Sequence, residues 1–132
     1  MSFGRRAALV GAGLLLVIAH PLAHHSLTSE FDVNRPVMLT GRVTRVEWVN
    51  PHAWLYIDVA GEHAGMASWR LQMGSPNSLV RRGWTRNSVR VGDVITAVGI
   101  RAKDGSEMAN IRSVVLPSRV RLLTGPADGQ TS

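Results

Sequence analysis

Apolar and polar residues alternate along much of the chain, a pattern typical of strands that bury one face. The stretch from Val37 to Val49 predicts a long strand, but its apolar parity changes near Thr44. Because successive side chains of a strand point to opposite faces, this change predicts a β-bulge or a sharp bend. Four shorter alternating stretches each predict a further strand: Ala53–Val59, Ala67–Met73, Asp93–Ile100 and Met108–Leu116.

The alternation also predicts which large side chains face the core. Trp69 and Met73 share the parity of Leu71, so we expect all three inside. Trp54 and Tyr56 have the parity opposite to the apolar positions of their strand, so we expect them on the outer face.

Between the third and fourth predicted strands the pattern changes to that of a short helix. Ser75 is a typical N-cap, Pro76 suits the first helical position, and Gly83 can end the helix after about two turns. The order strand, strand, strand, helix, strand, strand with a bent first strand is that of an OB-fold. We therefore predict an all-β fold, a small five-stranded OB-like barrel. Another small β-sandwich or meander is the alternative.

The beginning of the chain has the layout of a secretory signal peptide. Arg5 and Arg6 precede an apolar run from Ala7 to Ala19, and a small residue follows at Ala23. As a helix this run would span about 20 Å at ~1.5 Å per residue, short of the ~30 Å of a bilayer core. We expect cleavage after Ala23, with Ala19 as the competing site, and no permanent membrane span afterwards.

The predicted organisation has four parts. Residues 1–23 are the signal peptide, 24–36 an N-terminal segment with paired histidines, 37–123 the OB-like domain, and 124–132 a flexible tail rich in small residues. The expected location is the periplasm or the exterior.

Composition excludes several classes of protein. A 132-residue chain with 45% hydrophobic residues can fold as one domain, and its lack of cysteine excludes a disulfide scaffold, a thiolate metal site and a cysteine nucleophile. Cleavage would remove Arg5 and Arg6 and leave 13 basic against 9 acidic residues. This excess of arginine is spread along the chain, which indicates solubility. The sequence lacks the basic cluster interleaved with aromatic residues that would indicate nucleic-acid binding.

In an OB-fold the loop between strands one and two and the loop between strands four and five lie at the same end and commonly bind ligands. The first loop holds Asn50 and His52, and the second begins with Arg101 and Lys103. These side chains are expected at one rim, next to the outward-facing aromatics.

Several segments together resemble one family. They are HHS from His24, EFD from Glu30, LTGRVTRVEWVNPHAWLYIDV, WRLQM, RRGW, VGDVITAVG and DGSEMA. The chain resembles the uncharacterised secreted proteobacterial family that is numbered 6152 among domains of unknown function. The resemblance extends from about His24 to Leu116. The resemblance implies export and one domain, but no activity or cofactor. Leu27 stands where we expect an aromatic residue, and Gln72 where we expect an acidic one.

His24, His25 and His52 are candidate metal ligands. Neutral imidazole binds copper, nickel and zinc, and copper(II) binds most tightly among these divalent ions. After cleavage at Ala23, His24 would also offer a free amine, which makes copper the expected cofactor. Alternatively, the paired histidines are a processing or solubility feature, and His52 only forms a hydrogen bond to the backbone of a turn.

Some periplasmic copper carriers with an OB-fold bind copper(I) through histidine, methionine and a stacked tryptophan. Met66, Trp69 and Met73 are similar to these ligands in kind but not in spacing, and the parity places two of them in the core.

The alternative function is a module that binds an unknown periplasmic protein or a small ligand without metal. Trp54 and Tyr56 would stack on the ligand, while Asn50, Arg101 and Lys103 would bind its polar or charged groups. Metal binding should depend on pH near ~6.5, and binding of a charged ligand should depend on salt.

We expect no enzymatic activity. The chain has no HExxH, GxSxG or phosphate-loop motif. Ser26, His25 and Asp32 could be drawn as a triad, but a flexible N-terminal segment would not align them.

Overall fold

Strands account for most of the structure. The computed structural model describes residues 27–61 and 65–125 of the chain. The described residues form one six-stranded sheet and two short helices. In chain order the elements are α1 (Leu27–Glu30), β1 (Phe31–Glu47), β2 (Trp54–Ala60), β3 (Met66–Gln72), α2 (Pro76–Arg81), β4 (Val94–Ala102), β5 (Met108–Val115) and β6 (Arg121–Leu123).

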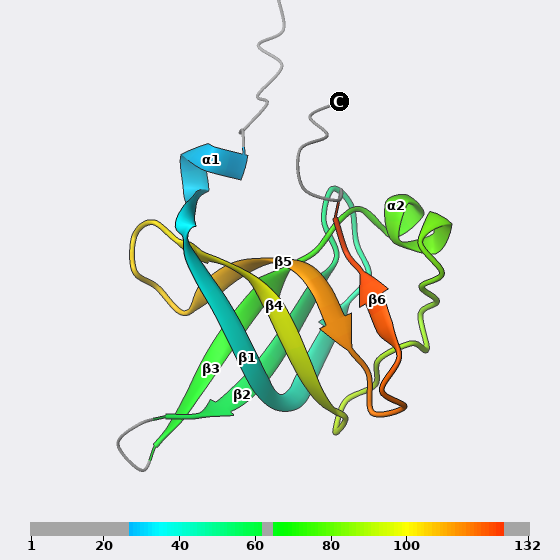
Figure 1. Cartoon of the computed structure of the whole chain (residues 1–132). Helices are drawn as coiled ribbons and strands as arrows, with labels where there is room; N and C mark the ends of the chain where they lie inside the picture. The colour runs from blue at the N-terminus through cyan, green and yellow to red at the C-terminus, as the bar shows by residue number, and fades with distance from the viewer. Residues whose placement is uncertain (1–26, 62–64, 126–132) are drawn as a thin grey trace, which may run out of the picture.

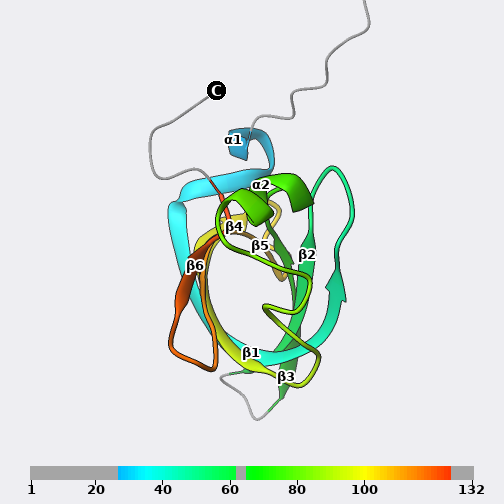
Figure 2. The same ribbon diagram turned by 90° about the vertical axis from the view of Figure 1, so that its right-hand side faces the viewer.

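The first five strands form a ring. Neighbours in the order β3-β2-β1-β4-β5-β6 pair antiparallel, and β3 also pairs with β5 in parallel. This additional pairing joins residues 70–72 to residues 108–110, and we call it the seam. Figure 2 shows the strands curving around this ring, with both helices at one end.

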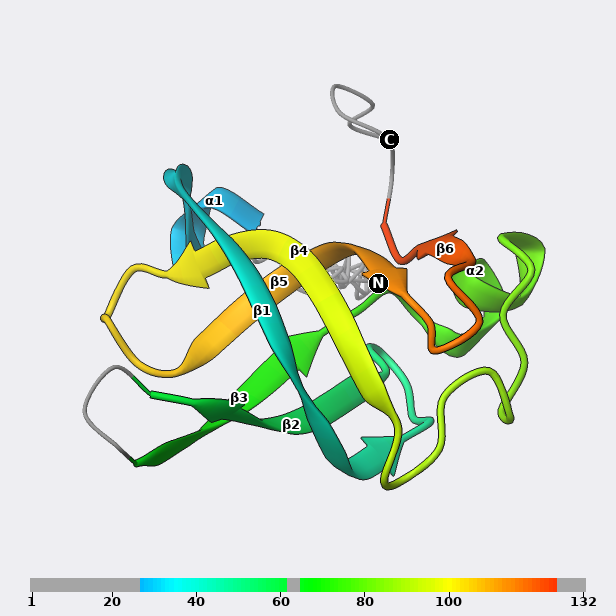
Figure 3. The same ribbon diagram turned by 60° about the horizontal axis from the view of Figure 1, so that its bottom comes forward.

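The bend predicted in the first strand is present. The register between β1 and β2 shifts between Val43 and Arg45, where the apolar parity changes. The earlier part of β1 pairs with β4 and the later part with β2, so one strand serves both halves of the ring (Figure 3). The strand begins at Phe31 rather than at Val37, because Phe31 pairs with Ala102 at the end of β4.

The ring surrounds the main apolar core. The inward positions of β2 and β3 are as predicted: Trp69, Leu71 and Met73 are all buried, as are Leu55 and Ile57. Residues of β1, β4 and β5 complete the core, together with Leu79 of α2 and with Trp84 and Val89 from the segment after it. The parity read from the sequence corresponds to the inside and outside of the ring along β2 and most of β3.

The helix between β3 and β4 forms as its sequence predicts. The side chain of Ser75 accepts a hydrogen bond from the backbone N–H of Ser78, and Pro76 occupies the first helical position. Leu79 is the buried residue of the helix, and Gly83 follows its end with φ +91°. Such a backbone conformation suits glycine, which has no Cβ.

The predicted count of five strands is too low, because the described residues contain a sixth. After β5 the chain turns back, and β6 pairs with residues 113–115. The indole of Trp84 donates a 2.8 Å hydrogen bond to the carbonyl oxygen of Leu123. Thr124, the first residue of the predicted tail, is buried, and its backbone N–H donates to the carbonyl oxygen of Arg112. The predicted signal peptide and the remainder of the tail, from residue 126, lie outside the described residues.

Candidate functional site

A hollow of about 290 Å³ lies where α1 and the β1–β2 connection meet β3 and β5. Figure 1 shows α1 and this connection at the same end of the ring, away from the β2–β3 hairpin. Seven of the described residues line this space, which we call the His52 hollow: Leu27, Glu30, Phe31, Pro51, His52, Gln72 and Asn110.

A small second core holds α1 over the hollow. Phe31 is 1% exposed and packs with Ile100 and Ala102 near the end of β4. The backbone N–H of Lys103 donates a 2.9 Å hydrogen bond to the carbonyl oxygen of Glu30. The start of the described chain is therefore fixed to the ring by both packing and a hydrogen bond.

Three polar side chains form a hydrogen-bonded row across the hollow. Gln72 Nε2 lies 3.3 Å from His52 Nδ1, and Asn110 Nδ2 donates to Gln72 Oε1 over 3.0 Å. Gln72 has the outward parity of β3, yet it is only 8% exposed. A buried amide needs partners at both ends, and His52 and Asn110 provide them.

Sequence analysis identified His52 but missed the other polar lining residues. From the sequence, Gln72 was distinguished only because the family resemblance leads us to expect an acidic residue at its position. Its polar character and outward parity indicate a surface position, and only the seam brings it beside Asn110. Asn110 lies 38 positions from Gln72 in the chain, so no local pattern could pair them.

The hollow offers two groups that can ligate a metal, the His52 imidazole and the Glu30 carboxylate. Nowhere in residues 27–61 and 65–125 do three histidine, cysteine, aspartate or glutamate side chains gather as a metal site. His24 and His25, the other predicted ligands, lie outside the described residues.

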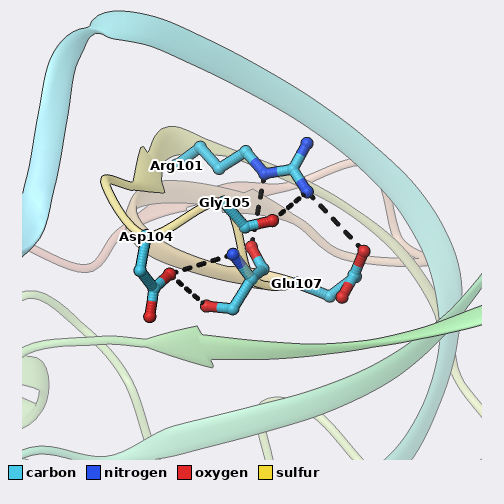
Figure 4. Close-up of polar contacts among 5 residues, drawn as sticks. Arg101, Asp104, Gly105 and Glu107 are labelled. Carbon is cyan, nitrogen blue, oxygen red and sulfur yellow. Dashed lines mark hydrogen bonds and ion pairs between the residues drawn. The ribbon is translucent and has the colours of Figure 1, made fainter.

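Arg101 and Lys103 of the predicted rim lie on the β4–β5 side, and the Arg101 side chain is engaged within its own loop (Figure 4). Its guanidinium donates to the carbonyl oxygens of Gly105 and Ser106 over 2.7 and 3.2 Å and lies 3.6 Å from the Glu107 carboxylate. It also lies 5.0 Å from the centre of the Trp69 ring. Arg101 therefore shapes this loop, while the Lys103 side chain is exposed.

The same loop contains a carboxylate with a shifted pKa. The hydroxyl of Ser106 donates to Asp104 over 2.7 Å, and its backbone N–H donates over 2.9 Å. These hydrogen bonds, with the nearby charge of Arg101, hold the pKa of Asp104 below its ordinary value. Asp104 therefore stays charged and helps to fix the turn.

Trp54 and Tyr56 are half-buried on the outer side of β2, opposite the buried Leu55. The guanidinium of Arg70 lies 5.1 Å from the centre of the Trp54 ring, and that of Arg45 lies 3.8 Å from the Tyr56 ring. One face of each ring is therefore already covered by an arginine. Asn50, in the β1–β2 connection, is exposed.

The chain belongs to a family of unknown function, DUF6152, whose model matches residues 13–111. The matched range includes every residue that lines the His52 hollow. A comparison with curated proteins found no match. In the described part of the chain, no helix is long and apolar enough to cross a membrane.

Proposed function

We propose that this protein is an exported, OB-like binding protein that holds a transition metal, copper before others, in the His52 hollow. His24 and His25 would supply the remaining ligands. The ring of strands with α2 between β3 and β4 supports the OB-like barrel, and the basic, apolar and small-residue pattern of residues 1–23 supports export to the periplasm or the exterior.

One observation carries the proposal: Leu27 and His52 line the same hollow. His25 precedes Leu27 by two residues in the sequence. Extended chain reaches at most about 7 Å over two residues and about 10 Å over the three that separate His24 from Leu27, so both histidines are tethered within a short distance of the hollow wall. The second small core around Phe31 keeps that tether in place.

The donor set suits copper. Imidazole nitrogens and an N-terminal amine are good ligands for copper(II), which leads the divalent first-row series in affinity. Glu30 adds a carboxylate on the same wall. Since the described lining of the hollow provides two such groups, His52 and Glu30, tight binding would require the histidines that precede Leu27.

The first test is to purify the protein from the periplasm under non-denaturing conditions and to measure its intact mass. The second is to measure copper binding by the processed protein. A chain that begins at His24 and carries copper is the expected result. His24→Ala should abolish tight binding and leave the melting temperature of the metal-free protein unchanged. His52→Ala should weaken binding by at least tenfold, since it removes one ligand from the site.

His63→Ala provides the matched control. His63 itself lies outside the described residues. In the sequence it falls between β2 and β3, and the ends of these two strands that flank it lie away from α1 (Figure 1). This variant should bind copper like the parent protein. Equal binding by the parent and the His24→Ala and His52→Ala variants would refute the proposed metal site.

The second candidate is a module that binds a small ligand or a periplasmic partner without metal. The apolar side chains of Leu27, Phe31 and Pro51 in the hollow favour it, as do the half-exposed rings of Trp54 and Tyr56. Binding that persists with a chelator and weakens with added salt would support this candidate. Binding that weakens as imidazole is protonated at low pH, and is lost with a chelator, would support the metal.

A further inference from the structure

We propose that Gln72 and Asn110 select which ring nitrogen of His52 carries the proton, and so decide whether the hollow accepts a hydrogen-bond acceptor or a metal ion. The inference deepens the proposed function, because it takes from it the role of His52 as the binding group.

The hydrogen-bonded row constrains His52 from one side. Asn110 Nδ2 donates to Gln72 Oε1, so the other end of the Gln72 amide, Nε2, faces His52. An amide nitrogen can only donate, and His52 Nδ1 must then accept. A neutral imidazole that accepts at Nδ1 carries its hydrogen on Nε2. In this arrangement His52 offers a donor, which suits a carboxylate or carbonyl ligand.

Metal binding needs the opposite arrangement. A ligating histidine binds the metal with one nitrogen and donates the other N–H to an oxygen. Turning the Gln72 amide by half a turn would place Oε1 against His52 Nδ1, which could then donate. His52 Nε2 would gain a free lone pair, and heavy atoms would occupy nearly the same positions.

The two amides must turn together. If only Gln72 turned, its Nε2 would meet Asn110 Nδ2, and two donors would face each other at 3.0 Å. Because Gln72 is 8% exposed, solvent has little access to relieve such a mismatch. Asn110, on β5, therefore acts on His52 through Gln72 as a positioning residue, although it does not contact the imidazole.

Two single substitutions force the metal-binding arrangement from different ends of the row. In Asn110→Asp the carboxylate only accepts, so Gln72 must donate to it and turn Oε1 toward His52. In Gln72→Glu one carboxylate oxygen keeps the Asn110 bond and the other accepts from His52 Nδ1. Each variant should change His52 from the Nε2–H to the Nδ1–H tautomer.

The readout is the pair of ¹⁵N shifts of the neutral His52 ring in the metal-free processed protein. We expect the Nε2–H tautomer in the parent and the Nδ1–H tautomer in both variants. Zn²⁺, a diamagnetic probe, should bind the variants about 10-fold or more tightly than the parent. Asn34→Asp is the control, because it adds the same charge at an exposed position of β1, outside the hydrogen-bonded row. It should change neither the His52 tautomer nor the Zn²⁺ affinity.

Each outcome tests a separate step. An Nδ1–H tautomer in the parent, or unchanged tautomers in the folded variants, would overturn the selection of the proton by the amides. A changed tautomer with Zn²⁺ affinity equal to that of Asn34→Asp would overturn its consequence for metal binding. Copper binding by His52→Ala equal to that of the parent would refute the proposed function. The tautomer measurement would be unaffected by that result, because it is made without metal.

Discussion

At the scale of single residues, two glycines let neighbouring strands approach closely. A Cβ on Gly99 would collide with the backbone carbonyl oxygen of Asn110, and one on Gly41 with that of Asp58. Gly99 lies at a register shift between β4 and β5, so the strand pairing leaves no room for a side chain there. The backbone of Asn110 also lies at the seam, which links this close approach to the candidate site.

Gly99→Ala should destabilise the protein by about 3 kcal/mol, the upper end of the usual cost of overpacking, because backbone rather than a mobile side chain must move. Urea unfolding monitored by tryptophan fluorescence measures the change. Gly65→Ala is the control, since an added Cβ there meets nothing within 4 Å. Equal unfolding free energies for the two variants would contradict the assigned close contact.

The residue scale also separates what could be predicted from what could not. Inward positions such as Leu71 follow from alternation, because burial of one sheet face imposes a period of two. The burial of Gln72 breaks that rule. The burial of Gln72 depends on α1 and on the seam, and both bring together residues that are far apart in the sequence. His52 could be proposed from its residue type, but its partners required the pairing of β3 with β5.

At the scale of elements, the start of β1 is an integral part of the fold. Phe31 pairs with Ala102, beyond a register shift that separates it from the Pro36–Ile100 pair, and is buried in the second small core. Removing its ring should leave a cavity between α1 and the end of β4. The hollow would then lose both a lining side chain and the support of α1.

Phe31→Ala should lower the free energy of unfolding by about 3–5 kcal/mol, as for other buried phenylalanines. Val33→Ala, in the same strand but with its side chain 50% exposed, should change it by less than about 0.5 kcal/mol. Chemical denaturation of the two variants provides the comparison. Similar stabilities would mean that the start of β1 does not contribute to the folded domain.

The elements that sequence analysis predicted correctly are those with strong local signals. Five alternating strands, the bend near Thr44 and the capped helix after Ser75 depend on neighbouring residues. The sixth strand has only three residues, too few for a period to be recognised, and it forms because β5 offers an edge. The early start of β1 was missed for a similar reason, since Pro36 and the polar residues before it interrupt the alternation.

At the scale of the whole molecule, the hollow lies across the seam that closes the ring. Its lining comes from α1, β1, β3 and β5 and from the β1–β2 connection. A ligand held there contacts segments that unfolding would separate, so its binding favours the closed ring. Binding only to the folded state stabilises by about 2.7 kcal/mol when the free ligand is at 100 times its Kd.

Saturating copper should therefore raise the Tm and slow hydrogen exchange where the ring is closed. The Arg70 amide, which donates to the Glu107 carbonyl over 2.9 Å, and the Lys103 amide, which donates to Glu30, report on the seam and on α1. The Gly61 amide in the β2–β3 hairpin serves as the distant reference. Both effects should disappear in His24→Ala, the variant expected to lose tight binding. Protection that is equal at all three amides, or absent at Arg70, would mean that the metal does not bind across the seam, because a ligand held there must restrain both of the strands that it joins.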